Sequence, residues 1–338
     1  MAVLILAGGS GLILQIVGPP PRPKVPPQAG LVTHTDPFPA KSPPVHLSHA
    51  EPRAALQPGR TLPGPVADPD PSLMEPYPND AALHLPRISP DGRAPMEAYA
   101  AGFDPSNLRP RVGLLIAGIG MNAADSLIAI KALPGGISLA VSPTAGDLTT
   151  LLAVARLNEH EYLLSLPMEP QSFPLNDPDN RMALMTSLSP ADNMQRLHGI
   201  LARLTGYVGV TNAFGPMRGE RLSGMPPQFD PVLEDVAHRG LLFADARTGQ
   251  PPLPYVWSRS ADIVLDDGTF DADVLDRRLD TLTHLALDKG SALGLVMLPR
   301  PVTLDRVAAW TNTLAAKGVA LAPVSALMHA APKQDPDK

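Results

Sequence analysis

Short apolar runs alternate with amphipathic stretches from Arg111 onward, and turn or helix-capping residues separate them. Runs that are apolar throughout are typical of strands covered by helices on both faces. The alternation therefore predicts repeated strand–helix units with parallel strands. The expected strands are residues 112–116, 137–141, 162–166, 207–210, 241–244, 263–265, 293–297 and 319–323.

Helix ends are marked by residues that satisfy unpaired backbone groups. Ser189 and Asp230 each precede a proline, which is the pattern of a capping residue before the first helical turn. Glycines close three of the stretches. Seven or eight units predict a closed or nearly closed α/β barrel over residues 111–328, with a disordered tail over 329–338. The expected helices are residues 189–204, 230–240, 271–289 and 303–317.

The region before the barrel has a different pattern. Residues 1–17 are almost entirely apolar, and as a helix they would be about 24 Å long, short of a hydrocarbon core of about 30 Å. We expect an uncleaved membrane anchor, with a cleaved signal or an unstructured apolar end as alternatives. Residues 18–110 hold more than half of the 42 prolines and predict a disordered, solvated linker. A long linker favours an inner-membrane anchor with the domain in the periplasm, or else secretion to the periplasm.

Composition narrows the possible chemistry. The formal net charge is −6, and no stretch concentrates lysine and arginine, so nucleic acid is not an expected partner. The absence of cysteine excludes disulfides, thiolate metal sites and cysteine nucleophiles. Reactive groups must therefore be oxygen atoms or imidazoles.

Functional groups of an α/β barrel lie at the carboxyl ends of its strands. Asp245 and Arg247 follow the fifth expected strand, and their proximity suits either a general base held ionised by a cation or a structural ion pair. Arg300, between two prolines, suits a bidentate contact to a substrate or a buried carboxylate partner. For the pair of Asp245 with Arg247, and likewise for Arg300, the sequence leaves the functional and the structural alternative open.

Five blocks of sequence resemble the divergent polysaccharide deacetylase family, in the same order and at compatible spacing. The resemblance implies a distorted TIM-like barrel that acts on carbohydrate, with a divalent metal such as zinc that activates water to remove an acetyl group. The blocks are residues 166–170, 209–215, 240–248, 299–310 and 318–327.

The chain departs from the family pattern where the chemistry is expected. The family's aspartate pair is Ala117 and Gly118 here, and its three histidines are replaced by Ser165, Ala213 and Leu298. Zinc needs about three nitrogen or oxygen ligands from the protein, and a serine hydroxyl is a weak substitute for imidazole. We therefore expect that the catalytic metal has been lost.

Other polar residues remain at positions that match the family. His160 is interpreted as structural because it precedes a strand, and Asp266 with Asp267 and Gly268 as an ordinary turn. Glu169 suits either a contact to a sugar hydroxyl or a loop cap. The residues expected to line a sugar-binding cleft are Glu169, Asn212, Arg247 and Arg300, with Asp245 and Thr248 beside them.

Three hypotheses follow. The first is a membrane-tethered barrel that binds an envelope glycan and has lost its metal. The second is an active deacetylase whose rearranged site uses Asp245, Glu169 and Asn212. The third is a spacer or partner-docking domain that binds no sugar.

Overall fold

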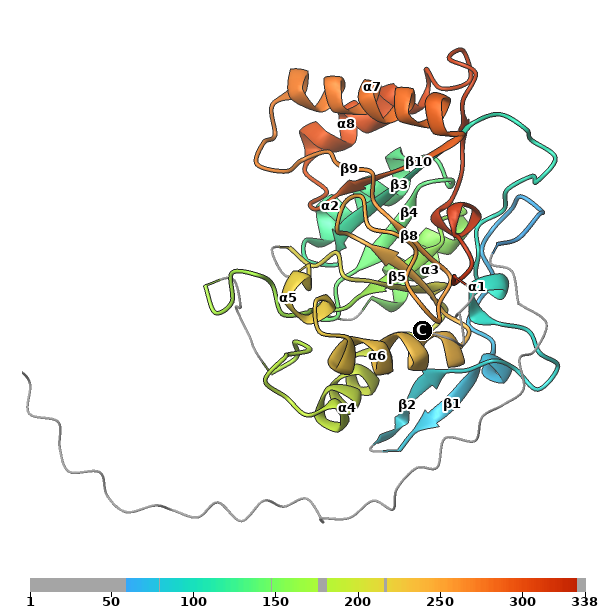
Figure 1. Ribbon diagram of the computed structural model, residues 1–338. Coiled ribbons are helices and arrows are strands. Elements are labelled where there is room, and N and C mark those ends of the chain that lie inside the picture. The colour runs from blue at the N-terminus through green and yellow to red at the C-terminus, as the bar shows by residue number, and fades with distance from the viewer. Residues whose placement is uncertain (1–58, 79, 147, 176–180, 216–217, 333–338) are drawn as a thin grey trace, which may run out of the picture. The chain divides into compact units, whose positions relative to one another are not determined.

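Parallel strands form a curled sheet at the centre of the computed structural model, which describes residues 59–78, 80–146, 148–175, 181–215 and 218–332. These strands are β3 (Arg111–Ile119), β4 (Ser138–Val141), β5 (Tyr162–Ser165), β6 (Gly209–Thr211), β7 (Leu242–Asp245), β8 (Ser258–Ser260), β9 (Ile263–Val264), β10 (Ser291–Val296) and β11 (Ala320–Leu321). They pair in the order β8-β7-β6-β5-β4-β3-β10-β9, and β11 pairs with β3 (Figure 1).

The two ends of this order are consecutive in the chain. β8 pairs with β7, β9 pairs with β10, and only Ala261 and Asp262 separate them. The Ala261 amide donates to the Asp245 carbonyl at 2.8 Å, and the Asp262 amide donates to the Leu293 carbonyl at 2.7 Å. One short segment thus bonds to both edges of the sheet. The predicted distorted TIM-like α/β barrel is confirmed.

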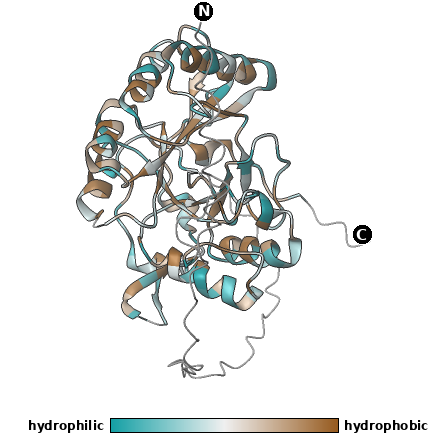
Figure 2. Cartoon of the chain, turned by 90° about the vertical axis from the view of Figure 1, so that its left-hand side faces the viewer, coloured by the Kyte–Doolittle hydropathy of each residue, from teal (hydrophilic) through white to brown (hydrophobic). Residues whose placement is uncertain are grey.

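Helices surround the sheet, and their hydrophilic and hydrophobic residues are interleaved (Figure 2). In α7, Leu275, Leu279 and Leu282 are buried at helical spacing, and Asp271 caps the helix by accepting from the Val274 amide at 3.0 Å. Ser189 caps α4 as predicted. The helices are α2 (Ala123–Ala132), α3 (Thr149–Leu157), α4 (Pro190–Leu201), α5 (Glu220–Ser223), α6 (Pro226–His238), α7 (Ala272–Lys289), α8 (Pro301–Thr311) and the short 3-10 helix η2 (Val324–Leu327).

The predicted start of the helix at Asp230 is wrong, because α6 begins at Pro226 and contains Pro231. Prolines suit the first turn of a helix, where amides have no partner within the helix. Pro231 costs one further backbone hydrogen bond, but the apolar face of Phe229, Val232 and neighbouring residues is buried around it. Packing therefore extends the helix past a residue that usually begins one.

The predicted linker is wrong for residues 59–110, which are folded against the barrel. They form the 3-10 helix η1 (Pro71–Leu73), the antiparallel hairpin of β1 (Met74–Tyr77) and β2 (Asp80–Pro86), and α1 (Pro95–Ala98). Leu73, Tyr99, Ala100 and Ala101 are buried in the core, which explains why the prolines do not keep the segment solvated. Residues 1–17 and 18–58 lie outside the described part. Among the described residues, no helix is long and apolar enough to cross a membrane.

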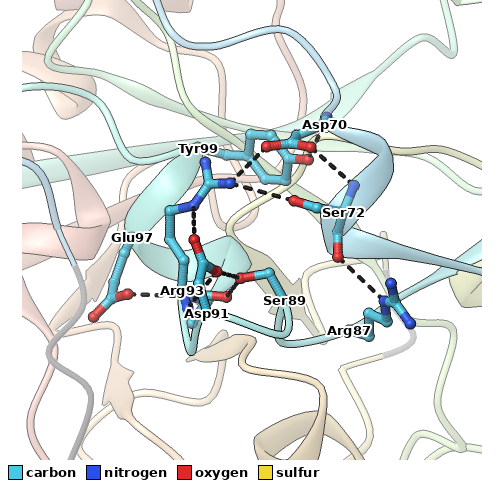
Figure 3. Close-up of polar contacts among 9 residues, drawn as sticks. Asp70, Ser72, Arg87, Ser89, Asp91, Arg93, Glu97 and Tyr99 are labelled. Atoms are coloured by element: carbon cyan, nitrogen blue, oxygen red, sulfur yellow. Dashed lines mark hydrogen bonds and ion pairs between the residues drawn. The ribbon is translucent and has the colours of Figure 1, made fainter.

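Local polar contacts also order this N-terminal segment (Figure 3). Asp70 accepts from the Ser72 amide at 2.8 Å and from Arg93 Nη2 at 2.7 Å, and its own amide donates to the Tyr99 hydroxyl at 2.9 Å. The hydrogen bonds from Ser72 and Arg93 lower the pKa of Asp70. The segment before β1 is thus tied to the region around α1.

Arg239 attaches the hairpin to the barrel. Its Nη1 lies 2.9 Å from Glu75 Oε1 in β1 and 2.9 Å from the Pro86 carbonyl in β2, while its Nε lies 2.8 Å from Asp235 Oδ2 in α6. Burial alone would raise the pKa of Asp235, but the hydrogen bond from His198 and the charge of Arg239 lower it overall. A guanidinium that is nearly buried thus joins three elements.

Glu161 holds the amino-terminal end of the barrel together. Its buried carboxyl accepts from the Ala101 amide at 3.0 Å, Ser138 Oγ at 2.7 Å, and the Ser325 amide and Oγ at 2.9 and 2.6 Å. Burial raises the pKa of Glu161, and the four donors act in the opposite direction. This one side chain connects the N-terminal segment, β4 and η2.

The predicted disordered tail begins too early, because His329 is ordered. Its backbone forms an antiparallel bridge with Ser258, with N–O distances of 2.9 and 3.0 Å. Arg259 Nη1 also lies 2.7 Å from its Nε2 atom. The edge of a short strand leaves backbone groups unpaired, and His329 pairs with those of Ser258 in β8. Residues 333–338 lie outside the described part.

Replacing Arg239 with methionine should lower the free energy of unfolding by about 3 kcal/mol at neutral pH, because the buried Asp235 would lose its arginine and keep only His198 as a partner. Because the pKa of Asp235 is lower in the folded state than its ordinary value of 3.8, ionised Asp235 stabilises the fold at pH values above 3.8. This stabilisation is lost as the pH falls through the pKa of Asp235 in the folded state. The difference between variant and wild type should therefore shrink below that pH. Urea denaturation at several pH values measures it.

Lys317→Met is the matched control, because it removes an exposed ion pair of 2.8 Å with Asp280. Its cost should stay below about 1 kcal/mol. If Arg239→Met costs no more than this control, the attachment of the hairpin through Arg239 is not a stabilising contact.

Candidate functional site

The parallel sheet brings the carboxyl ends of its strands to one end of the barrel, called the mouth below. The loops after β3, β5, β6, β7, β9 and β10 meet there, and they carry the residues that the sequence singles out. In such barrels, binding and catalysis take place at this end. The residues below are therefore described by the contacts they make at the mouth.

Asp245, the last residue of β7, is paired with Arg247. Arg247 Nε lies 3.0 Å from Oδ1 and Nη2 lies 2.5 Å from Oδ2, which is a bidentate contact, and the Arg247 amide donates to Oδ1 at 2.9 Å. The Asp245 side chain is only 1% exposed. Both carboxylate oxygens thus already accept hydrogen bonds from the chain itself.

Asn212 completes this arrangement from the neighbouring strand. Its Nδ2 donates to Asp245 Oδ1 at 3.0 Å and to the Arg218 carbonyl at 2.7 Å, and its Oδ1 accepts from the Ala246 amide at 2.6 Å. The buried amide therefore fixes the loop after β6 against the loop after β7. The oxygen and the nitrogen of the Asn212 side chain are thus both engaged in contacts between these loops.

Glu169, in the loop after β5, joins two other parts of the mouth. Its Oε2 accepts from the Thr186 amide at 2.5 Å, and its Oε1 lies 3.1 Å from Arg221 Nη1 in α5. The carboxylate is buried. Of the two roles predicted for Glu169, these contacts support the one as a loop cap.

The positions at which the resemblance implies the family's ligands hold buried residues without a ligand group of the expected kind. Ala117 and Ala213 are fully buried in the core, and Ser165 is buried with its Oγ unpartnered among the described residues. Gly118 has a φ of +74°, and a Cβ there would lie 3.2 Å from the Met297 carbonyl oxygen. An aspartate would therefore be strained in the backbone conformation that Gly118 adopts.

Leu298 stands where the family has a histidine, and Asp266 holds its backbone. Asp266 accepts from the Met297 amide at 2.8 Å and the Leu298 amide at 3.0 Å. Burial raises the pKa of Asp266, and the two amides oppose this. The turn predicted at Asp266 is present, but its carboxylate has a further role that sequence reasoning missed, since its partners lie about 30 residues later, in the loop after β10.

Arg300 lies over an aromatic ring. Its guanidinium carbon is 5.6 Å from the centroid of Phe270, whose side chain is 44% exposed. Within the described part of the chain, Arg300 has no carboxylate partner, so its donors remain available to a ligand. Sequence reasoning missed Phe270, although an aromatic residue in a loop after a strand was the available signal.

The donors present do not fit a catalytic zinc. Among the described residues, no three histidine, aspartate or glutamate side chains are grouped to hold a metal ion. His160 lies before β5, at the opposite end, with its ring nitrogens 2.7 and 3.0 Å from the Ile137 and Ile130 carbonyl oxygens. Thr248 is exposed and offers one hydroxyl. These groups fall short of three ligands around an open position.

Comparison with known proteins assigns the chain to a family. No curated protein matches the chain. An uncharacterized protein of Agrobacterium tumefaciens C58 has a similar structure, with 29% identity and a TM-score of 0.66 over 72% of this chain and 99% of that one. A family 4 carbohydrate esterase of Streptomyces lividans, in complex with acetate, matches with 15% identity and a TM-score of 0.40 over 66% of this chain and 98% of that one. The family profile "Divergent polysaccharide deacetylase" matches residues 114–328, so the chain belongs to this family.

Proposed function

We propose that this protein is a carbohydrate-binding member of its family that holds no catalytic metal and removes no acetyl groups. The observation that carries the proposal is the bidentate pair of Asp245 with Arg247. A general base or a metal ligand needs a lone pair directed at its target. Both oxygens of Asp245 are instead engaged by Arg247, and Asn212 adds a further donor.

The same holds for the other carboxylates at the mouth. Glu169 is held by Arg221 and the Thr186 amide, and Asp266 by two backbone amides. Freeing a buried carboxylate from its cation costs about 3 kcal/mol or more. Carboxylates that hold loops in place are therefore poorly suited to leave them for a metal, which supports a binding role over the alternative of a rearranged active site.

Phe270 and Arg300 are the groups we assign to carbohydrate. An exposed aromatic ring offers an apolar face that can pack on a sugar ring, and a guanidinium can donate two parallel hydrogen bonds to neighbouring oxygens. The pair lies at the mouth, where family members are expected to bind carbohydrate.

We further propose that residues 1–17 anchor the protein to the inner membrane, with the barrel in the periplasm facing the envelope glycan.

Zinc should not bind tightly to the full-length protein, because the mouth lacks three available ligands. Isothermal titration with zinc should show no stoichiometric binding, and an N-acetylated oligosaccharide incubated with the protein and zinc should release no acetate. Tight one-to-one binding together with acetate release would establish the active deacetylase instead.

Replacing Asp245 with asparagine should lower the free energy of unfolding by about 3 kcal/mol, because Arg247 would lose its buried anionic partner. Urea denaturation measures this loss. Asp288→Asn, on the exposed face of α7, is the control and should change stability by less than about 0.5 kcal/mol. A stable Asp245→Asn protein would argue against the structural role of this pair.

Phe270→Ala should weaken carbohydrate binding about tenfold, since the ring supplies most of the apolar contact we propose. A glycan array identifies a ligand for the wild type, and titration with that ligand measures the change. Leu287→Ala, which removes an exposed apolar side chain of α7, should have no effect. A wild-type protein that binds no glycan would leave the spacer or docking hypothesis in place.

A further inference from the structure

A second candidate site shares no residue with the set described at the mouth. A cleft of about 720 Å³ is bordered by β2, the loop between β4 and α3, one side of α3 and the loop between α4 and β6. Its volume falls within the range of small-molecule sites, roughly 300–1,000 Å³. None of the mouth residues described above lines it. β2 belongs to the N-terminal hairpin, so this cleft exists only because that segment is folded.

The charged residues described along the cleft are basic, whereas the chain as a whole has a formal net charge of −6. Arg156 and Arg203 line the cleft together with His84, and the described lining residues include no aspartate or glutamate. Two guanidinium groups on one concave surface, with no carboxylate among the lining residues that the structure describes, favour an anionic ligand.

Arg156 is held in place before any ligand arrives. Its Nε lies 3.1 Å from Asp68 Oδ1, and its Nη1 donates to the Tyr162 hydroxyl at 3.0 Å. Its Nη2 has no partner in the described part of the chain. Asp68 is 90% exposed, so solvent screens its pairing with Arg156. A guanidinium that is already ordered loses less entropy when it binds an anion.

Tyr162 in turn is positioned by its own contacts. Its hydroxyl donates to the Thr205 carbonyl at 2.8 Å, and burial raises the pKa of Tyr162 to about 12, so the hydroxyl stays protonated. Gly206, with a φ of +78°, permits this approach, because a Cβ there would lie 2.7 Å from the Tyr162 hydroxyl. Thr205 thus holds Tyr162, and Tyr162 accepts a hydrogen bond from Arg156. The loop between α4 and β6, which lines the cleft, therefore also helps to position Arg156.

We propose that this cleft binds a small sugar that carries a carboxylate or phosphate group. Arginine matches the geometry of both anions through two parallel hydrogen bonds. Leu83, Leu148 and Leu152 add apolar surface to the lining, which suits the body of a sugar ring better than a bare ion. The site shares no residue with Phe270 and Arg300, to which carbohydrate binding at the mouth is assigned, and it does not depend on that function.

The test uses the full-length protein and isothermal titration with three probes, namely trigalacturonate, inorganic phosphate and the neutral trisaccharide maltotriose. Arg203→Gln is the informative variant, because Arg203 is exposed and has no partner among the described residues, so the fold should be unaffected. Arg277→Gln, on the exposed face of α7, is the matched control. Thermal melting of both variants verifies that they remain folded.

Trigalacturonate should bind the wild type more tightly than phosphate does, while any binding of maltotriose, at the mouth, should be the same in Arg203→Gln as in the wild type. Arg203→Gln should weaken trigalacturonate binding about tenfold, and Arg277→Gln should leave it unchanged. Added salt should weaken trigalacturonate binding as well. The proposal is overturned if neither charged probe binds, if Arg203→Gln weakens maltotriose binding as much as trigalacturonate binding, or if Arg203→Gln binds trigalacturonate like the wild type. Phosphate binding that matches or exceeds trigalacturonate binding would overturn the assignment to a sugar.

Discussion

The fold depends on one short segment, residues 258–264, that bonds to both edges of the curled sheet. Its first part pairs with β7 and its last part with β10, and the change of partner takes place at Ala261 and Asp262. Asp245 lies at this point, because its carbonyl accepts from the Ala261 amide while its carboxylate is held by Arg247. Asp245 therefore takes part in closure of the barrel through its backbone and in the arrangement of the mouth through its side chain. Its carboxylate is bound by Arg247 at the point where the sheet closes.

The polar side chains of the mouth bind mainly to the chain itself. A buried polar group without a partner is costly. Ala117 and Ala213 pack in the core, and Gly118 adopts a backbone conformation that disfavours a side chain. The buried carboxylates of Glu169 and Asp266 each bind other parts of the chain. Ser165 Oγ, by contrast, is buried without a partner among the described residues.

Sequence reasoning predicted the barrel, most strands and the caps of α4 and α7, because apolar runs and capping residues act locally. It placed Asp245 beside Arg247 for the same reason. It missed β8 and Phe270, whose roles depend on neighbours far away in the chain. The largest error was the folded segment before the barrel. Proline content indicated a linker there, but burial of the intervening Leu73 and Tyr99 is a tertiary effect that composition does not reveal.

That folded segment has a functional consequence beyond stability. Arg239 fixes both strands of the hairpin to α6, and β2 then forms one wall of the cleft that contains Arg156 and Arg203. The mouth is built by loops of the barrel itself, whereas the cleft requires the barrel and the added hairpin together. An extension that only tethered a domain would need no such attachment. The ion pairs that hold the hairpin therefore also hold one wall of the cleft, so a change that loosens the hairpin should alter the cleft as well.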